Sequence, residues 1–300
     1  MNRLSIVEKY AQPEVVEFWR RLSEQGLQRC EHEMLARYAP PPARVIDLGC
    51  GAGRVSLALA GRGYEVTGID LVREMIRTAY DLHLQAGLPL RLIQADVQAV
   101  PCASGCYDVA LVFIAALQHI GGRSIRQRVF GEIARVLRSG GVLILALDNL
   151  APALTCYAWW AWRKVRSISM RSRRGHSIDL TAADDLLESR RVNRSALSWH
   201  VRGLRRTLRW RTWNGFIDAA RRMRWLPGEV GDLAIDQVSL DSTHGSVYYH
   251  IYQHAELIED AARGGFELLA YHDGRELNEG QTFPARIRQL DKQVLYAFRR

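Results

Sequence analysis

Hydrophobic and polar positions follow distinct patterns along this chain of 300 residues. In residues 1–40, apolar side chains such as Trp19, Leu22 and Leu35 recur at roughly helical spacing with charged residues between them. This spacing predicts a helical N-terminal segment that ends at Pro40-Pro41-Pro42. After it, short apolar runs alternate with amphipathic stretches up to residue 149, and the same rhythm returns near the C-terminus. Such alternation is typical of strands that alternate with helices.

The alternating segments predict an α/β fold with a doubly wound, mostly parallel, Rossmann-like sheet and helices on both faces. Strands are expected at 44–48, 65–70, 90–95, 108–114, 142–147, 266–271 and 293–298. Helices are expected at 54–62, 73–85, 126–137 and 256–263.

The rhythm is interrupted over about a hundred residues, which predicts an insertion. We expect an N-terminal helical segment over 1–40, a core formed by 41–149 and 254–300, and a largely helical inserted cap over 150–253.

Composition places the protein among ordinary globular chains, with 48% hydrophobic and 24% charged residues. Glu8, Lys9 and Glu14 leave no apolar region for an export signal near the N-terminus. The longest apolar stretch, 150–162, is shorter than the roughly 20 residues that cross a bilayer. The five cysteines are scattered and odd in number, which favours reduced thiols and a cytoplasmic protein. Cys102 and Cys106 have no second pair at a matching spacing, so no metal is expected.

A glycine-rich loop follows the first predicted strand, with glycines at 49, 51 and 53. In a doubly wound fold this loop faces the crevice at the carboxyl edge of the sheet, where backbone N–H groups meet ligands. Glycine at these positions lets the backbone approach a ligand closely. A dinucleotide fingerprint would place its third glycine at position 54, but this chain has Arg54, so binding of a nicotinamide dinucleotide is disfavoured.

The run Asp47-Leu48-Gly49-Cys50-Gly51-Ala52-Gly53 resembles motif I of the class I S-adenosylmethionine-dependent methyltransferases. The resemblance extends over residues 44–148 and, more loosely, 246–299. It implies the same fold, S-adenosyl-L-methionine as cofactor, and a glycine loop that lines the methionine and ribose portions of that cofactor.

Two further carboxylates follow predicted strands at the positions that this family uses. Asp70 ends the second strand and can accept hydrogen bonds from both ribose hydroxyls, with Leu71 next to it. Asp96 follows the third strand and matches the adenine-contacting acid of the family, and the N–H of Val97 is placed to reach a ring nitrogen. The alternative is that these acids only cap strand ends, where aspartate is favoured anyway.

The predicted cofactor-binding set therefore comprises the residues of the loop and of the two strand ends. These are Asp47, Gly49, Cys50, Gly51, Gly53, Asp70, Leu71, Asp96 and Val97.

Two histidines are candidate catalytic residues. His119 lies in the loop after the fourth strand, which commonly faces the substrate in this family, and would act as a general base or orienting group. A histidine bonded to a nearby backbone group is the alternative. His250 lies in Tyr248-Tyr249-His250, a segment similar to one in tRNA wobble-uridine carboxymethyl methyltransferases. An amphipathic edge strand leading into a helix is the alternative there.

The insertion is strongly basic and rich in tryptophan. Residues 163–224 hold seventeen Lys or Arg against five Asp or Glu, a local net charge of +12 in a chain whose net charge is +9. Seven of the eight tryptophans also fall in the insertion. This composition suits contact with RNA or with a membrane surface through residues 150–225, or a cap whose tryptophans form its own core and whose arginines are solvated.

The sequence thus favours methyl transfer to a small or lipid-like acceptor that the cap encloses. A tRNA-modifying methyltransferase that binds RNA through the basic cap is the alternative, and a non-catalytic binding module is disfavoured by the complete cofactor motif.

Overall fold

The computed structural model describes residues 3–113, 116–148, 229, 232–235, 247–280 and 293–300. The chain divides into two compact units, Met1–Asn149 with Gly231–Arg300, and Leu150–Val230. The second unit lies almost wholly outside the described residues, and so does the basic surface predicted over 150–225. Of the cap predicted over 150–253, only 229, 232–235 and 247–253 are described. None of the described helices is both long enough and apolar enough to cross a membrane.

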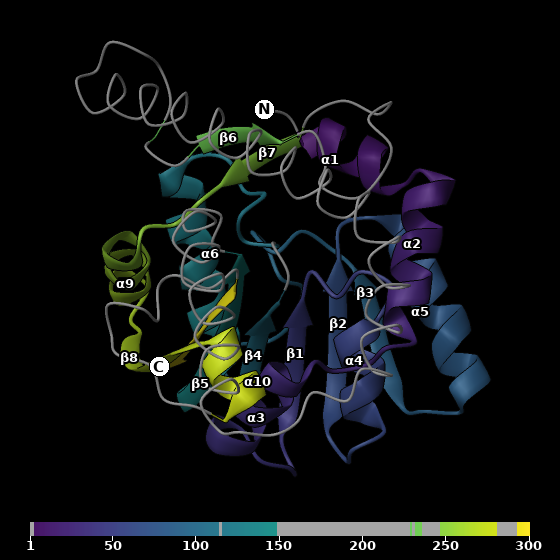
Figure 1. Cartoon of the computed structure of the whole chain (residues 1–300), viewed down its shortest axis with the longest axis horizontal. Helices are drawn as coiled ribbons and strands as arrows, with labels where there is room; N and C mark the ends of the chain where they lie inside the picture. The colour runs from purple at the N-terminus through teal and green to yellow at the C-terminus, as the bar shows by residue number, and fades with distance from the viewer. Residues whose placement is uncertain (1–2, 114–115, 149–228, 230–231, 236–246, 281–292) are drawn as a thin grey trace, which may run out of the picture. The chain divides into compact units, whose positions relative to one another are not determined.

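The first unit is built on a seven-stranded sheet with strand order β3-β2-β1-β4-β5-β9-β8 (Figure 1). Strands β1 to β5 run parallel, whereas β9 is antiparallel to both of its neighbours. The strands are β1 Arg44–Leu48, β2 Glu65–Asp70, β3 Leu90–Gln94, β4 Tyr107–Val112, β5 Leu137–Asp148, β8 Glu267–Asp273 and β9 Gln293–Arg299. The predicted α/β class with a mostly parallel, Rossmann-like sheet is confirmed.

Helices connect and cover the strands. The N-terminal helical segment consists of α1 Arg3–Tyr10, α2 Pro13–Ser23 and α3 Arg29–Tyr38. Within the core the helices are α4 Arg54–Ala60, α5 Arg73–Ala86, α6 Arg123–Val136, α9 His254–Arg263 and α10 Gly274–Glu279.

Alternation along the central strands buries side chains on both faces of the sheet. On one face, Ile144 of β5 packs in a cluster with residues of α3, α4 and α10. On the other face, Leu143 and Phe298 pack in a cluster with residues of α6 and α9, such as Phe130. Helices therefore cover both faces, and only the strand ends and their loops remain to form a binding site.

A separate two-stranded hairpin lies near one of these loops. It pairs β6 Asp232–Ile235 with β7 Val247–His250 in antiparallel fashion. The His250 N–H donates to the Gln118 carbonyl over 2.7 Å, and the Tyr249 hydroxyl donates to Gln118 Oε1 over 2.9 Å. Tyr249 and His250 are both buried, although alternation along β7 directs their side chains to opposite faces. At these two residues the strand is therefore buried on both faces, whereas an amphipathic edge strand would expose one face.

Candidate functional site

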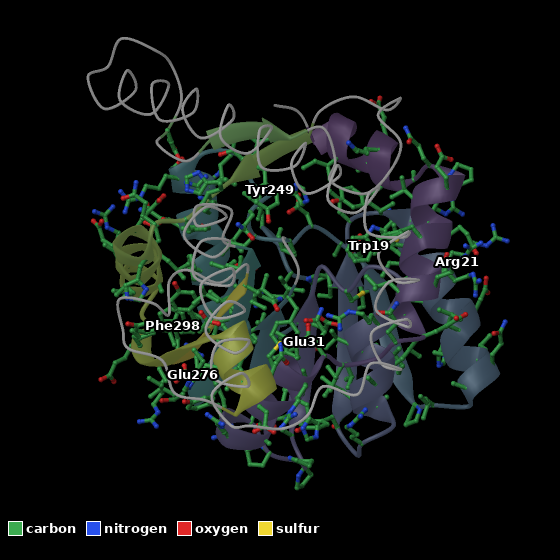
Figure 2. The ribbon with its side chains drawn as sticks, viewed as in Figure 1. Trp19, Arg21, Glu31, Tyr249, Glu276 and Phe298 are labelled. Atoms are coloured by element: carbon green, nitrogen blue, oxygen red, sulfur yellow. The ribbon has the colours of Figure 1, made fainter. Side chains whose placement is uncertain are left out.

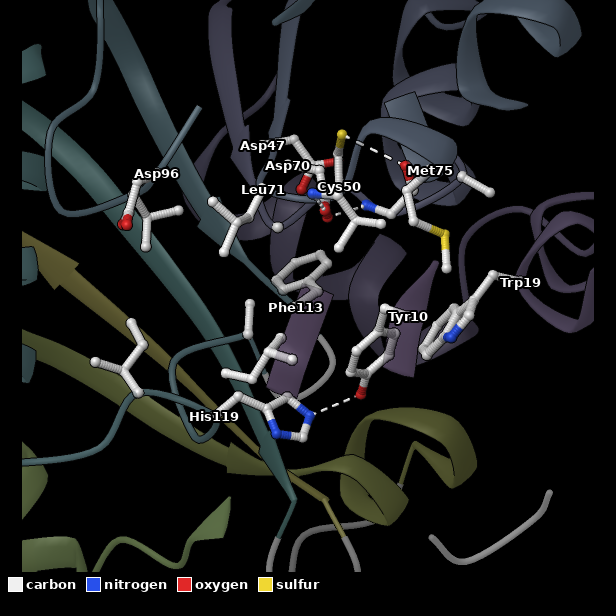
Figure 3. Close-up of a pocket in the computed structure, with 18 of the residues that line it drawn as sticks. Tyr10, Trp19, Asp47, Cys50, Asp70, Leu71, Met75, Asp96, Phe113 and His119 are labelled. Carbon is white, nitrogen blue, oxygen red and sulfur yellow. Dashed lines mark hydrogen bonds between the residues drawn. The ribbon is translucent and has the colours of Figure 1, made fainter. Parts of the chain in front are cut away.

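A cavity of about 430 Å³ lies at the carboxyl ends of β1, β2 and β4 (Figure 3). Eight of the nine predicted cofactor residues line it, and Gly53 is the one that does not. The eight are Asp47, Gly49, Cys50, Gly51, Asp70, Leu71, Asp96 and Val97. Residues that are separate in the sequence thus border one space, as the topology of a parallel sheet requires.

Glycine is required at the three positions of the loop for different structural reasons, although all three residues have positive φ. A Cβ on Gly49 would lie 2.5 Å from the Cβ of Ala116, so this glycine allows close approach to the loop after β4. A Cβ on Gly51 would meet no atom within 4 Å, so the backbone there borders open space. A Cβ on Gly53 would lie 3.1 Å from the Cβ of Ala79, so this glycine serves the packing of α4 against α5.

The carboxylate of Asp70 is fixed by the loop that it supports. Its Oδ2 accepts the N–H of Gly51 and its Oδ1 accepts the N–H of Val72, each over 2.9 Å. Burial raises the pKa of Asp70, and the two N–H groups oppose that rise. A carboxylate has about four acceptor positions, so Asp70 can cap the strand end and still accept from hydroxyls of a ligand.

Asp96 and Asp47 border the cavity in different settings. Asp96 Oδ1 accepts the N–H of Gln98 over 2.8 Å, which fixes the turn after β3. Asp47 is 2% exposed and its Oδ2 accepts from Ser56 Oγ over 2.6 Å. Burial raises the pKa of Asp47 to about 6 despite the Ser56 hydrogen bond.

His119 is held in one orientation by two partners. Its Nδ1 lies 2.9 Å from the carbonyl oxygen of Tyr248, and its Nε2 lies 2.8 Å from the hydroxyl of Tyr10 (Figure 3). Because a carbonyl only accepts, Nδ1 carries the proton, and Nε2 accepts from Tyr10. Burial lowers the pKa of His119, and the nearby charge of Lys9 lowers it further. The ring is thus bonded to the backbone, as the structural alternative predicted, and also lines the cavity.

His250 is fully buried and does not belong to the cavity wall. Its Nε2 lies 3.0 Å from Nη2 of Arg126 and 2.9 Å from Oε1 of Glu256. The Tyr252 ring meets it edge to face with centroids 4.9 Å apart. The structure therefore places His250 in a polar cluster between β7, α6 and α9, and its catalytic role stays a prediction.

The N-terminal helices contribute residues that we did not predict for the site. Tyr10 of α1 and Trp19 and Ser23 of α2 line the cavity. Ser23 Oγ donates to the carbonyl of Ala52 over 3.0 Å, which joins α2 to the glycine loop. Of these, only Trp19 belonged to the helical spacing of apolar residues, and that spacing carries no signal for what the residue faces.

The cavity has two chemically different ends. In Figure 3, Asp96 and Trp19 lie at opposite sides of the view, with Asp70 between them. Tyr10 lies beside Trp19, and His119 lies below them. Apart from Tyr10, which bonds to His119, the lining residues of the β4–α6 loop and the start of α6 include Ala116, Ile120 and Ile125, which are apolar, and Arg128, which is charged.

The end of the cavity that holds Asp70 and Asp96 fits a nucleoside that carries an amino-acid tail. Carboxylates stand at two strand ends, and Gly51 leaves the space next to Asp70 open. Carboxylates are the hydrogen-bond acceptors that the hydroxyls of a ribose and the amine of an adenine require as donors.

Comparison with known proteins agrees with this geometry. Residues 45–141 match a family described as a methyltransferase domain. The chain is 32% identical over 119 residues to a ubiquinone biosynthesis O-methyltransferase of Xanthomonas axonopodis pv. citri, an alignment that covers 39% of this chain and 48% of that protein. The chain spans about half or less of the length of the curated relatives that it matches.

Solved structures share the fold over most of the chain. A SAM-dependent methyltransferase from Methanosarcina mazei superposes with a TM-score of 0.54 at 19% identity, covering 89% of this chain and 96% of that one. The CcbJ methyltransferase from Streptomyces caelestis superposes with a TM-score of 0.52 at 14% identity, covering 90% and 88%. At these identities the likeness concerns the fold.

The matched domain covers the glycine loop, strands β1 to β4 and the start of β5, and the strand order and the likeness in fold agree with it. Residues 45–141 are thus similar to a methyltransferase domain, and the fold of the chain is shared with SAM-dependent methyltransferases of known structure.

Proposed function

We propose that this protein transfers a methyl group from S-adenosyl-L-methionine to a small or lipid-like acceptor. The observation that carries the proposal is the single cavity that joins the predicted cofactor residues to an apolar wall around His119. One end of this cavity suits a nucleoside, and the other suits a molecule of low polarity.

The chain's own residues would hold the cofactor through groups already fixed in place. Asp70 would accept from the ribose hydroxyls, and Asp96 would accept from the adenine amine, with the N–H of Val97 near a ring nitrogen. The Gly49–Gly53 loop would follow the ribose and the amino-acid tail. When bound, the cofactor supplies an electrophilic methyl group on a sulfonium.

The main contribution of the protein to such a displacement is positioning and exclusion of water. Phe113, Ile120 and Ile125 provide an apolar wall, and α1 brings Tyr10 to the same cavity. His119, with its fixed ring, would orient the acceptor or take its proton.

A relative supports an acceptor of this kind. The Xanthomonas protein is named as a ubiquinone biosynthesis O-methyltransferase, and this name supports the proposal of a lipid-like acceptor. The alternative of tRNA modification depends on residues 150–225, which lie outside the described residues. It stays an alternative, and salt-dependent tRNA binding would favour it.

Binding of S-adenosylhomocysteine, the product form of the cofactor, tests the proposal. We expect it to raise the melting temperature of the full chain, and Asp70→Asn to weaken its affinity by about ten- to hundredfold, because hydrogen bonds to a charged group are lost. Asp81→Asn is the matched control, because Asp81 is an exposed aspartate of α5 outside the cavity. Micromolar binding of NAD together with no response to S-adenosylhomocysteine would contradict the proposal.

A further inference from the structure

The contact between Tyr10 and His119 joins two distant parts of the chain at the apolar end of the cavity. The two residues are 109 positions apart, and both line the cavity. Their rings meet edge to face with centroids 5.5 Å apart, and the Tyr249 ring packs on His119 in the same way at 5.2 Å. The imidazole is therefore clamped between two aromatic rings, with its Nε2 directed at one hydroxyl.

The hydrogen bonds of His119 define the direction in which a proton can move. The proton on Nδ1 is committed to the Tyr248 carbonyl, so Nε2 is the basic atom. The Tyr10 hydroxyl donates to Nε2, and the lone pairs of its oxygen can accept a further proton. A proton that arrives at the Tyr10 oxygen can thus be passed to Nε2 without rearrangement of either side chain.

The charged groups near this pair favour a neutral acceptor over a cationic one. The carboxylates among the described lining residues are Asp47, Asp70 and Asp96, which form the cofactor end. The charge that acts on His119 is the cation of Lys9, and Arg128 also lines the cavity. An ammonium group bonded to His119 would therefore have no carboxylate beside it among the described lining residues outside the cofactor end, whereas a hydroxyl on an apolar ring needs none.

We propose that Tyr10 and His119 form a proton relay that prepares a hydrophobic acceptor bearing an acidic hydroxyl, such as a phenol, for O-methylation. This inference rests on the proposed function and specifies its acceptor class. Tyr10 is then a catalytic residue that touches the acceptor, and His119 is the terminal base.

The step balances without a further reactant. The acceptor hydroxyl gives its proton to the Tyr10 oxygen while the Tyr10 phenolic proton moves to His119 Nε2, which becomes an imidazolium. The acceptor oxygen forms a bond to the methyl carbon, and the carbon–sulfur bond of the donor breaks with its electron pair going to sulfur. The imidazolium afterwards returns one proton to solvent.

The first test observes the histidine itself and requires no turnover. Nitrogen-15 NMR of the full chain with S-adenosylhomocysteine should show that His119 is the neutral Nδ1–H tautomer at pH 7.5. The His119 resonances are assigned from their disappearance in the variant His119→Asn. Tyr10→Phe should shift the Nε2 resonance. Tyr80→Phe should not, because Tyr80 of α5 is 51% exposed, packs on His83 and lies outside the cavity. A proton on Nε2 of His119, or an Nε2 resonance that is unchanged in Tyr10→Phe, would contradict the relay.

The second test measures release of S-adenosylhomocysteine from the wild-type protein with 2-naphthol, catechol and 4-nitrophenol, and with benzylamine and phenethylamine as amines of similar size. We expect turnover with phenols, a loss of about a hundredfold in kcat for Tyr10→Phe, and little change in the Kd of S-adenosylhomocysteine. The acid limb of the pH profile of kcat should disappear in His119→Gln.

Turnover of amines in preference to phenols, an absence of turnover with every phenol, or wild-type kcat in Tyr10→Phe would overturn the inference. A wild-type protein that does not bind S-adenosylhomocysteine would overturn the proposed function instead, so the two failures are distinguishable.

Discussion

Arg54 and Glu31 form a buried ion pair with two parallel hydrogen bonds between α4 and α3. Nη1 of Arg54 lies 2.7 Å from Oε2 of Glu31, and Nη2 lies 2.5 Å from Oε1. Their side chains are 6% and 0% exposed. Glu31 also accepts the N–H of Gln28, which closes the start of α3 (Figure 2 labels Glu31 inside the molecule). The residue that breaks the dinucleotide spacing thus fastens the N-terminal helices to the end of the glycine loop.

Loss of one partner of this pair should be costly. Arg54→Ala leaves the buried carboxylate of Glu31 without its cation, so we expect the free energy of unfolding in urea to fall by about 3–5 kcal/mol. Arg263→Ala is the control, because its pair with Glu259 is about half exposed and should contribute under about 1 kcal/mol. Equal losses in the two variants would show that the Arg54 pair does not hold the helices in place.

Gly49→Ala should destabilise the protein more than Gly63→Ala does. Both glycines have positive φ, +77° and +83°, so both substitutions bring the cost of a left-handed residue, about 1–2 kcal/mol. Only at Gly49 does the new Cβ collide, with Ala116, which adds about 1–3 kcal/mol. Urea unfolding of the two variants measures the difference, and identical free energies would contradict the close approach of the two loops.

The cofactor end of the site could be predicted because its residues sit at fixed places in the strand-loop-helix pattern. Asp70 ends a strand and Gly49 follows one, and the parallel sheet brings such positions to the same edge. The contact of Tyr10 with His119 could not be predicted. It joins helix α1 to a loop 109 positions away in the sequence. The spacing of apolar residues within a helix does not indicate which distant loop the helix will contact.

The bounds of β5 show a second limit of sequence reasoning. The sequence predicts a helix over 126–137 whose end is marked by Gly140-Gly141, and a strand over 142–147. In the structure β5 begins at Leu137, where it pairs with Tyr107. A register shift between Tyr107 and Val109 absorbs the irregularity, so the glycines lie inside the strand. Glycine marks bulges as well as turns, and only the pairing partner distinguishes the two.

Asp47 should make stability depend on pH in the direction opposite to that of an ordinary ion-paired acid. Its pKa is raised in the folded chain from 3.8 to about 6, mainly by burial, so the folded state holds the proton more tightly than the unfolded state. This contribution is complete below about pH 4 and is lost as the pH rises through about 6. Asp47→Asn removes it and keeps an oxygen for Ser56. In urea unfolding of the apo protein, the free energy of unfolding of the variant minus that of wild type should increase by on the order of 3 kcal/mol as the pH is raised from 4 to 7. A difference that does not vary with pH would contradict the raised pKa.

His250→Gln should separate a structural role from a catalytic one. The imidazole is fully buried between Arg126 and Glu256, and its own backbone N–H and carbonyl bond to Gln118, the residue before His119. Glutamine brings a polar end near the Nε2 position but lacks the planar ring that packs on Tyr252 and fixes both polar contacts, so we expect the free energy of unfolding to fall by about 1–3 kcal/mol. Since His250 does not line the cavity, the affinity for S-adenosylhomocysteine should stay within about threefold of wild type, a change of under 1 kcal/mol. Urea unfolding and calorimetric titration measure the two quantities on the same preparation. A variant with wild-type stability and abolished turnover would show instead that His250 takes part in the reaction, as its place in the sequence had suggested.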